Sequence, residues 1–290
     1  MNGIKMGDKM CSILKYKNCV GRNFDYEKSY NEEIRTINSM EYDNEFEIIG
    51  VCAGIVDYPL MYDGINEHGL VVGALAFEGN AQYFDEKKDK INIPAFDFVF
   101  QILSSFKTVK EVKDFLENVN ITNKQFSEDF PNSDLHWFVA DHTDSIIVEQ
   151  TIEGLKVYHG DVMTNNPPYP DQIDICKQFF EHMEPLLIPK INKFYTRGVE
   201  TAGLDGDYTS FGRFARLTYL KYHLEKTQDC EIFDPVAQTF HLLSSVEQIY
   251  GSTPVNNDFE YTIYSIVYDM DLCTIIVKPY DKIELDYYSF

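Results

Sequence analysis

The 290-residue sequence is poor in basic residues. It has 25 lysines and arginines against 47 aspartates and glutamates, which gives a formal net charge of −22 at pH 7. The sequence pI is close to 4.6. A surface of this charge repels nucleic-acid phosphates and is not attracted to anionic membranes. We therefore expect an acidic, soluble protein of the cytoplasm that binds neither nucleic acids nor membranes.

Long apolar runs and patterned cysteines are also missing. No stretch approaches the roughly 20 apolar residues of a membrane-spanning helix. The first ten residues contain no apolar segment of the kind that secretion signals carry. The cysteines are scattered without a C-x-x-C pair, which argues against a disulfide framework or a structural zinc site and favours a reducing compartment. The six are Cys11, Cys19, Cys52, Cys176, Cys230 and Cys273.

Cys11 is the most informative residue of the chain. It follows a short polar lead, residues 1–10, and begins a strand-like run. If the lead is removed, Cys11 carries a thiol and a free α-amine on the same carbon. That amine, with a reference pKa of about 7.7–8.0, can act as a base near neutral pH, so such a nucleophile needs no histidine. The competing interpretation is a buried strand cysteine, which is common for a free thiol.

The lead can be lost in two ways. Translation that starts at Met10 would expose Cys11 after ordinary removal of the initiator methionine. Alternatively, residues 1–10 are a propeptide that the cysteine itself removes. No repeat, low-complexity segment or long linker divides the rest of the chain. We therefore expect residues 1–10 to be a lead or a mis-assigned start, and residues 11–290 to form a single domain.

Hydrophobic patterns predict strands, helices, strands, helices and strands in that order. The stretch 57–70 is rich in turn-forming residues, and the apolar run 70–77 suits a strand buried on both faces. Helical spacing is found over 96–103, 109–116, 171–182, 210–225 and 234–249. The other expected strands are 11–16, 18–24, 33–38, 46–53, 135–140, 145–150, 154–159, 260–268, 271–278 and 282–288. This order predicts an α+β fold built in layers.

Several separated segments, in order along the chain, resemble those of one family. The segments are Met10-Cys11, 21–25, 63–70, 131–137, 148–151, Thr164-Asn165-Asn166-Pro167, 206–209, Gly212-Arg213-Phe214 and 251–253. They are similar to motifs of the choloylglycine hydrolases, N-terminal-nucleophile hydrolases that include conjugated bile salt hydrolases and penicillin V acylases. The resemblance implies a four-layer αββα sandwich and cleavage of a linear amide C–N bond.

The resemblance also implies roles for five residues. Cys11 would be the nucleophile, and Arg22 would lie near its sulfur and favour the thiolate. Asp25 would hold the free α-amine, and the Asn165 side chain would donate a hydrogen bond to the tetrahedral oxyanion. Arg213 would be a second arginine of the active site. No metal ion or organic cofactor is implied. The family's tendency to form homotetramers predicts a homo-oligomer, with 171–205 as a contact region.

The expected substrate is a small-molecule amide with an apolar acyl group. Conjugated bile salts come first, and penicillin V or another N-acyl amide is the alternative. Ala76 departs from the family, because bile salt hydrolases usually have asparagine at its position and penicillin V acylases often have tyrosine. The residues expected to bind the substrate are Phe24, Tyr26, Met61, Tyr62, Ala76 and Phe77.

Two other classes of function compete with this hypothesis. A non-catalytic relative would keep the pocket but never expose Cys11. A metallohydrolase would use His68, His136, His142 and neighbouring acids. The histidines show no H-E-x-x-H or similar ligand pattern, so the metallohydrolase is the weaker of the two.

Overall fold

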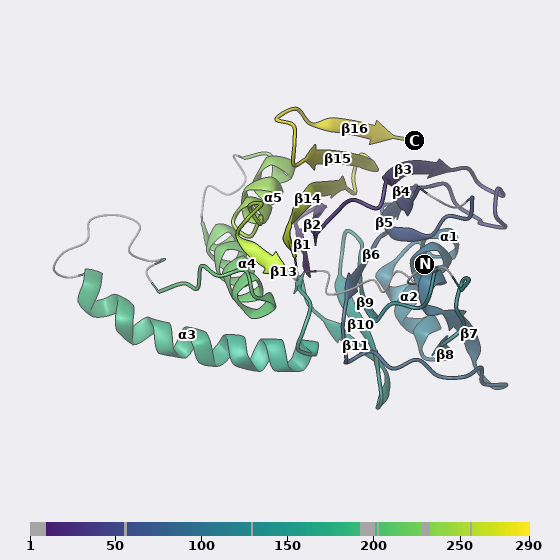
Figure 1. The fold of residues 1–290 in the computed structure, drawn as a ribbon, viewed down its shortest axis with the longest axis horizontal. Helices are drawn as coiled ribbons and strands as arrows, with labels where there is room; N and C mark the ends of the chain where they lie inside the picture. Colours follow the sequence, from purple (N-terminus) through teal and green to yellow (C-terminus); the bar gives the residue numbers. More distant parts are fainter. Residues whose placement is uncertain are drawn as a thin grey trace.

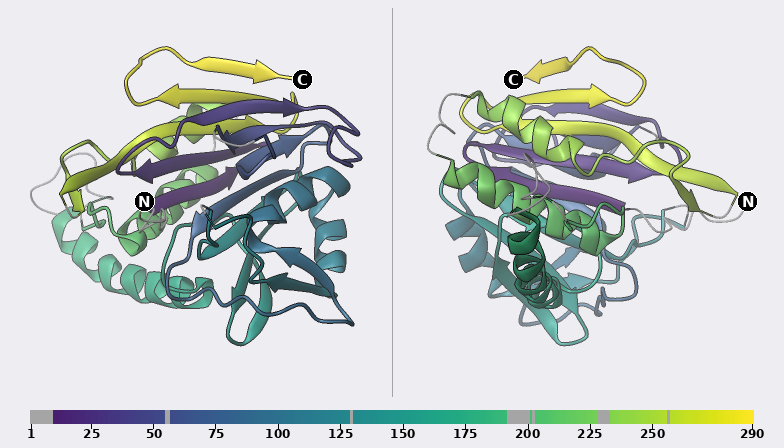
Figure 2. Two further views of the ribbon diagram at one scale, coloured as in Figure 1. Left: turned by 45° about the vertical axis from the view of Figure 1, so that its right-hand side comes forward. Right: turned by 90° about the vertical axis from the view of Figure 1, so that its left-hand side faces the viewer.

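The fold places two seven-stranded antiparallel sheets face to face, with helices on both outer sides (Figure 1). The computed structural model describes residues 10–54, 57–128, 130–191, 201, 203–227, 233–255 and 257–290, the side chains of 182–191 excepted. Helices α4 and α5 cover the first sheet, and α1 covers the second (Figures 1 and 2). This arrangement confirms the predicted α+β class and the αββα sandwich.

The first sheet holds the chain segment around Cys11. Its strands run in the order β12-β1-β2-β14-β15-β16, and β13 pairs with β14. The bounds are β1 Met10–Tyr16, β2 Cys19–Tyr26, β12 Val162–Met163, β13 Thr253–Val255, β14 Asp258–Asp269, β15 Thr274–Pro279 and β16 Asp286–Ser289.

The second sheet faces β1 and β2 across the molecule. Its strands run in the order β11-β10-β9-β6-β5-β4-β3, and a separate parallel pair joins β7 to β8. The bounds are β3 Glu32–Ile37, β4 Ile48–Ala53, β5 Met61–Asn66, β6 Val71–Ala76, β7 Ile91–Pro94, β8 Val119–Thr122, β9 Leu135–Ala140, β10 Ser145–Thr151 and β11 Gly154–His159.

The helices form the outer layers. Thr108 caps α2 through a capping box with Glu111. Helix α3 packs beside α4 and then extends away from the sheets (Figure 1). The bounds are η1 Ala95–Asp97, α1 Phe98–Ser105, α2 Val109–Leu116, α3 Tyr169–Ile191, α4 Ser210–Lys226 and α5 Pro235–Ser244.

Most predicted elements are confirmed, and one stretch was wrong. The predicted turn-rich stretch 57–70 contains the strand β5. Its Gly64 lies within this strand and not in a turn. The position needs glycine because a Cβ there would lie 2.7 Å from the Met61 Cε and 3.0 Å from the Leu103 Cδ1 of α1. The short strands β7, β8, β12 and β13 carried no recognised pattern.

Strand β6 shows why the apolar run at 70–77 lacks alternation. Val71 and Leu75 pack into the core that contains the interface between the two sheets. Val72 and Ala74 pack into the second core, beneath α1 and α2. Because both faces of the strand are buried, apolar residues occupy successive positions, as the sequence predicted.

Helix α5 sits very close to β2 at Gly21. A Cβ at Gly21 would lie 2.4 Å from the Thr239 Cγ2 and 3.0 Å from the Leu243 Cδ1. Both side chains are fully buried, so neither can move aside into solvent. Any side chain at this position must push α5 away from the sheet.

We therefore expect Gly21→Ala to destabilise the protein by about 1–3 kcal/mol, the usual cost of overpacking a core. Gly206→Ala is the matched control, because a Cβ at Gly206 meets no atom within 4 Å. Its effect should stay within about 0.5 kcal/mol. Urea denaturation of both variants measures the difference, and equal stability of the two would contradict the close contact between α5 and β2.

Candidate active site

Cys11 and Arg22 lie on the face of the first sheet that is turned toward the second sheet. In the antiparallel pair of β1 and β2, Cys11 is opposite Phe24 and Ile13 is opposite Arg22. Side chains at opposite positions share a face, and side chains two residues apart do so as well. The thiol, the guanidinium and the Phe24 ring therefore lie together between the sheets, and all three residues are buried.

The guanidinium of Arg22 is fixed beside the sulfur. Its Nη2 lies 3.6 Å from the Cys11 Sγ and donates to the Ala74 carbonyl at 2.8 Å. Its Nη1 donates to the Tyr62 carbonyl at 3.1 Å and forms a buried ion pair with Asp63. Strands β5 and β6 thus hold the cation that a thiolate at Cys11 would need.

The carboxylate of Asp63 was not predicted to belong to the site. It is fully buried on β5 and accepts hydrogen bonds from Arg22 and from the Tyr268 hydroxyl of β14. The motif 63–70 is part of the family resemblance, but nothing local to it indicates that Asp63 pairs with an arginine 41 residues earlier.

The other buried cysteines lie in surroundings that suppress the thiolate. Burial raises the pKa of Cys19, Cys52 and Cys176 to about 12 in each case. Such thiols stay protonated at neutral pH and are poor nucleophiles. Cys230 lies outside the described residues.

Asn165 contacts the backbone of Cys11. Its Oδ1 accepts from the Cys11 N–H at 2.9 Å and from the Arg213 Nη2 at 2.8 Å. Its Nδ2 donates to the Ala76 carbonyl at 2.9 Å. The amide predicted to stabilise an oxyanion is therefore next to Cys11, with its donor directed at the end of β6.

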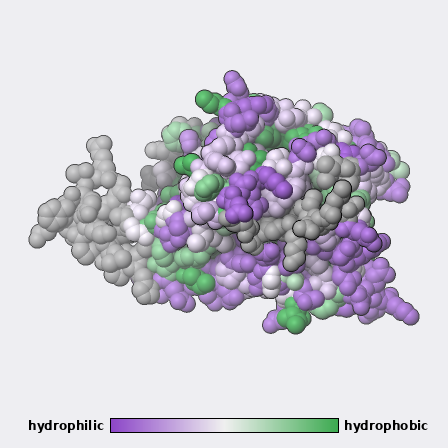
Figure 3. All heavy atoms as spheres, viewed as in Figure 1, coloured by the Kyte–Doolittle hydropathy of each residue, from purple (hydrophilic) through white to green (hydrophobic). Residues whose placement is uncertain are grey.

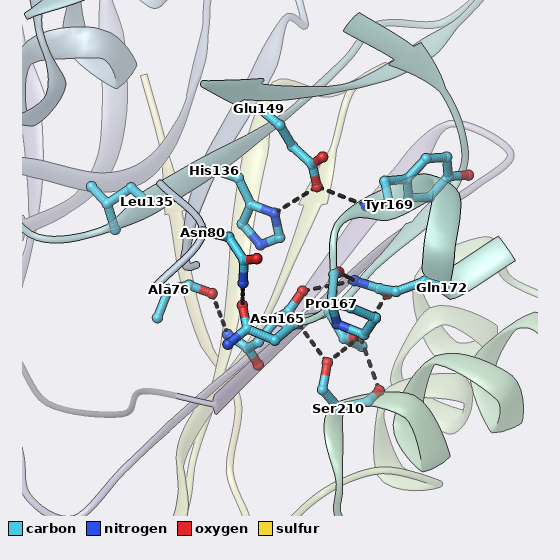
Figure 4. Close-up of polar contacts among 12 residues, drawn as sticks. Ala76, Asn80, Leu135, His136, Glu149, Asn165, Pro167, Tyr169, Gln172 and Ser210 are labelled. Atoms are coloured by element: carbon cyan, nitrogen blue, oxygen red, sulfur yellow. Dashed lines mark hydrogen bonds and ion pairs between the residues drawn. The ribbon is translucent and has the colours of Figure 1, made fainter. Parts of the chain in front are cut away.

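The loop that carries Asn165 is held by hydrogen bonds from three elements (Figure 4). The Ser210 Oγ, at the start of α4, accepts from the Asn165 N–H at 2.9 Å. The Gln172 Nε2, on α3, donates to the carbonyls of Asn165 and Pro167, both at 2.7 Å. The Glu149 carboxylate accepts from the Tyr169 N–H, where α3 begins, at 3.0 Å. The position of Asn165 thus depends on α4, α3 and the Glu149 side chain of β10, and the sequence did not indicate these contacts.

Arg213 connects α4 to the first strand. Its Nη1 donates to the Cys11 carbonyl at 2.5 Å and to the Ser12 Oγ at 2.7 Å, and its Nε donates to the Tyr208 carbonyl at 2.9 Å. Burial lowers the pKa of its guanidinium from the usual value, and the nearby Asp25 and Cys11 act in the opposite direction. Together with Asn165 it fixes both backbone groups of Cys11.

Asp25 lies on the opposite face of the sheet from the sulfur. It accepts from the Thr262 Oγ1 at 2.5 Å and from the Gln248 Nε2 at 3.1 Å. Burial raises the pKa of its carboxyl group to about 6, and Arg213 acts in the opposite direction. In the strand register Asp25 is opposite Met10. In this structure the Cys11 nitrogen forms a peptide bond with Met10. The predicted contact between Asp25 and a free α-amine can therefore form only in a chain that has lost residues 1–10.

A mostly apolar cavity opens at Cys11, and it contains four of the six predicted substrate-binding residues: Phe24, Met61, Tyr62 and Ala76. Tyr26 and Phe77 do not line it. The hydroxyl of Tyr26 pairs with that of Tyr30, and the fully buried ring of Phe77 stacks on His136 with 4.4 Å between centroids. Further lining residues that the sequence did not indicate are Tyr30, Leu60, Phe96, Phe126, Phe130 and Leu135.

The histidines do not assemble into a metal site. Across the part of the chain that the structure describes, no group of three or more His, Cys, Asp and Glu side chains is placed to hold a metal ion. His68 packs on Phe46, His136 pairs with Glu149, and His142 pairs with Asp271. The geometry therefore does not support the metallohydrolase hypothesis.

No helix in the described part of the chain combines the length and the apolar character needed to cross a membrane.

Comparisons with known proteins agree with this geometry. Residues 11–290 match the sequence model of the linear amide C–N hydrolases of the choloylglycine hydrolase family. A bile salt hydrolase/transferase of Lactiplantibacillus plantarum is 38% identical over 96% of this chain and 91% of its own length. Another, of Clostridium perfringens, is 33% identical over 80% of this chain and 76% of its own length.

Solved structures give the same result. A variant of the conjugated bile acid hydrolase from Clostridium perfringens superposes with a TM-score of 0.85 at 27% identity, covering 97% of this chain and 92% of that one. A penicillin V acylase from Agrobacterium tumefaciens shares the fold, with a TM-score of 0.71 at 18% identity over 98% of this chain and 86% of that one. On its sequence and its fold, this chain belongs to the choloylglycine hydrolase family and is a linear amide C–N hydrolase.

Proposed function

We propose that this enzyme deconjugates bile salts, with Cys11 as an N-terminal nucleophile. One observation carries the proposal: a buried cysteine sulfur lies 3.6 Å from a fixed guanidinium at the edge of an apolar cavity. The relatives named bile salt hydrolase/transferase supply the substrate class. A conjugated bile salt offers a large apolar acyl group joined by an amide bond to a small amine, and such a cavity suits the acyl group.

The first chemical step needs a chain that begins at Cys11. Its α-amine accepts the thiol proton, and the sulfur attacks the carbonyl carbon of the substrate amide. The Arg22 guanidinium stabilises the thiolate that forms during the attack. Arg213 and Asn165 hold the backbone of Cys11, so that the sulfur and the amine keep one relative position.

The second step is collapse of the tetrahedral intermediate. The Asn165 Nδ2 turns from the Ala76 carbonyl toward the oxyanion, which it meets as a hydrogen-bond donor. The amine product leaves with the proton that the α-amine had accepted. Water then attacks the remaining thioester and releases the acid. These steps use only the protein's own groups and water.

The cavity limits how the acyl group can bind. Its enclosed space is about 100 Å³, below the roughly 300–1,000 Å³ usual for ligand pockets. A steroid acyl group must therefore extend through the mouth or displace part of the wall. Phe126 and Phe130 belong to the irregular segment between β8 and β9, so this part of the wall is the part we expect to move.

Penicillin V is the second candidate substrate. Aromatic rings such as Phe24, Tyr62 and Phe96 line the cavity, and they suit a phenoxyacetyl group as well as a steroid. Ala76 lacks the side-chain donor expected of either class. Release of glycine or taurine from conjugated cholate should be faster than release of 6-aminopenicillanic acid from penicillin V. The reverse order would favour the acylase, and no turnover of either substrate would support an unprocessed ligand-binding relative.

Asn165→Asp tests the oxyanion role, because aspartate keeps the acceptor for Cys11 and loses the donor. We expect kcat to fall by about 10²–10³, the usual cost of one oxyanion donor. Asn166→Asp is the matched control: it makes the same change one residue away, where Nδ2 donates to the Glu78 carbonyl at 3.0 Å. Steady-state kinetics should show a much smaller loss for the control, and equal losses would contradict the role of Asn165.

We also propose that the enzyme is a cytoplasmic homotetramer and that α3 contributes to its interfaces. The face in Figure 3 is largely hydrophilic, and hydrophobic residues gather at its lower left, where α3 lies. Ile175 on α3 is 40% exposed. The remainder of the predicted contact region 171–205 is partly outside the described residues. Native mass spectrometry should give four copies, and a monomer at micromolar concentration would contradict the proposal.

A further inference from the structure

A second buried carboxyl group lies beside Asp25, and the chemistry above does not use it. Glu260 on β14 is 1% exposed. The Gln248 Nε2 donates to the Asp25 Oδ2 at 3.1 Å and to the Glu260 Oε1 at 3.2 Å. Two acids therefore share one neutral amide in the interior, where a carboxylate without a full set of partners is costly.

One oxygen of the Glu260 carboxyl group, the buried Oε2, lacks a well-aligned hydrogen-bond partner among the described residues. Glu260 also lines a surface hollow together with Met10, Ala76 and Asn165. Burial and the charge of Asp25 raise the pKa of Glu260 to about 8, while Arg213, Gln248 and the Met10 N–H act to lower it.

The strand register explains why both acids face the N-terminal side of Cys11. Asp25 is opposite Met10 on β1 and opposite Thr262 on β14. Glu260 precedes Thr262 by two residues, so its side chain lies on the same face. Both carboxyl groups therefore flank the position of Met10, next to the nitrogen of Cys11. In a chain without the lead, that nitrogen is a primary amine whose protonated form is a cation.

We propose that Glu260 is a positioning residue for the α-amine of Cys11, and that with Asp25 it forms a carboxylate pair that binds the ammonium form. The inference rests on the proposed function, since it requires a liberated Cys11. The other charged groups near this pair are Arg213 from α4, the exposed Glu78 at the hollow, and Arg22 with the Cys11 thiol on the opposite face of the sheet.

The direction of the effect follows from the charges. Each carboxylate near the α-amine stabilises its protonated form and raises its pKa, and the ammonium in turn lowers the pKa of Glu260 from the raised value that it has in a chain with the lead, so that Glu260 is charged beside it. Only the neutral amine can accept the thiol proton, so activity rises as the pH passes through the pKa of the amine. Removing the charge of Glu260 should lower that pKa and move the acidic limb of the pH–rate profile to lower pH.

The experiment uses active enzyme whose N-terminal Cys11 has been verified by mass, with a conjugated bile salt as substrate. For Glu260→Gln, the acidic limb of kcat/KM should move down by about one pH unit, the lower end of the range for a neighbouring charge. Glu78→Gln is the matched control, because it removes the same charge from an exposed position in the same hollow. Its limb should stay within about 0.2 units, since solvent screens exposed charges.

A merely structural role for Glu260 would lower the rate at every pH and leave the limb in place, which would overturn the inference. If Glu260→Gln does not fold, Glu260→Asp takes its place. Aspartate keeps the charge but holds it one methylene farther from the amine, so the acidic limb of kcat/KM should also move to lower pH, by less than the one unit expected for Glu260→Gln. An unmoved limb in that variant would also overturn the inference. Absence of amide hydrolysis by the unmutated enzyme would instead defeat the proposed function.

Discussion

The structure depends on one buried contact, that between the Arg22 guanidinium and the Cys11 sulfur. A guanidinium in the protein interior is tolerated only when its donors are satisfied and its charge is balanced. Burial acts to lower the pKa of Arg22, but the neighbouring Cys11 sulfur acts to raise it, and the pKa lies above its usual value. The Asp63 carboxylate completes the balance. Because Arg22 comes from the first sheet and Asp63 from the second, the sandwich must close before their ion pair can form.

Strand β1 separates two environments with different chemistry. On one face the Cys11 sulfur meets Arg22 and a cavity of aromatic and aliphatic side chains. On the other face Asp25 and Glu260 share an amide beneath α4 and α5. In a chain that begins at Cys11, the thiol faces the substrate cavity and the α-amine faces the two acids. The α-amine can then act as the base for the thiol without lying in the apolar cavity. The period-two geometry of a strand is sufficient to produce this division.

Local patterns predicted much of the fold. Alternation and apolar runs located most strands, and helical spacing located the helix at 109–116. Strand β5 was missed because Asp63-Gly64 has the composition of a turn, whereas in the fold Gly64 makes room for α1. The information that distinguishes these two uses of glycine lies in the packing of a helix about 40 residues later, so no local window contains it.

The same limit applies to the site. Cys11, Arg22, Asn165 and Arg213 were identified by resemblance, and the fold brings them together. Asp63 pairs with Arg22, and Gln248 bonds to Asp25 and Glu260. Before the chain folds, these three residues are indistinguishable from surface acids and amides. Phe77 was placed in the pocket because it follows an apolar strand, but its fully buried ring stacks on His136 and does not line the cavity.

The most direct test is mass spectrometry of the enzyme quenched with acid while it turns over a conjugated bile salt. The account predicts an N-terminal peptide that begins at Cys11, and a fraction of that peptide heavier by one cholyl group on the sulfur. An enzyme of full activity whose Cys11 nitrogen is still joined to Met10, or whose acyl group is attached to another residue, would contradict it.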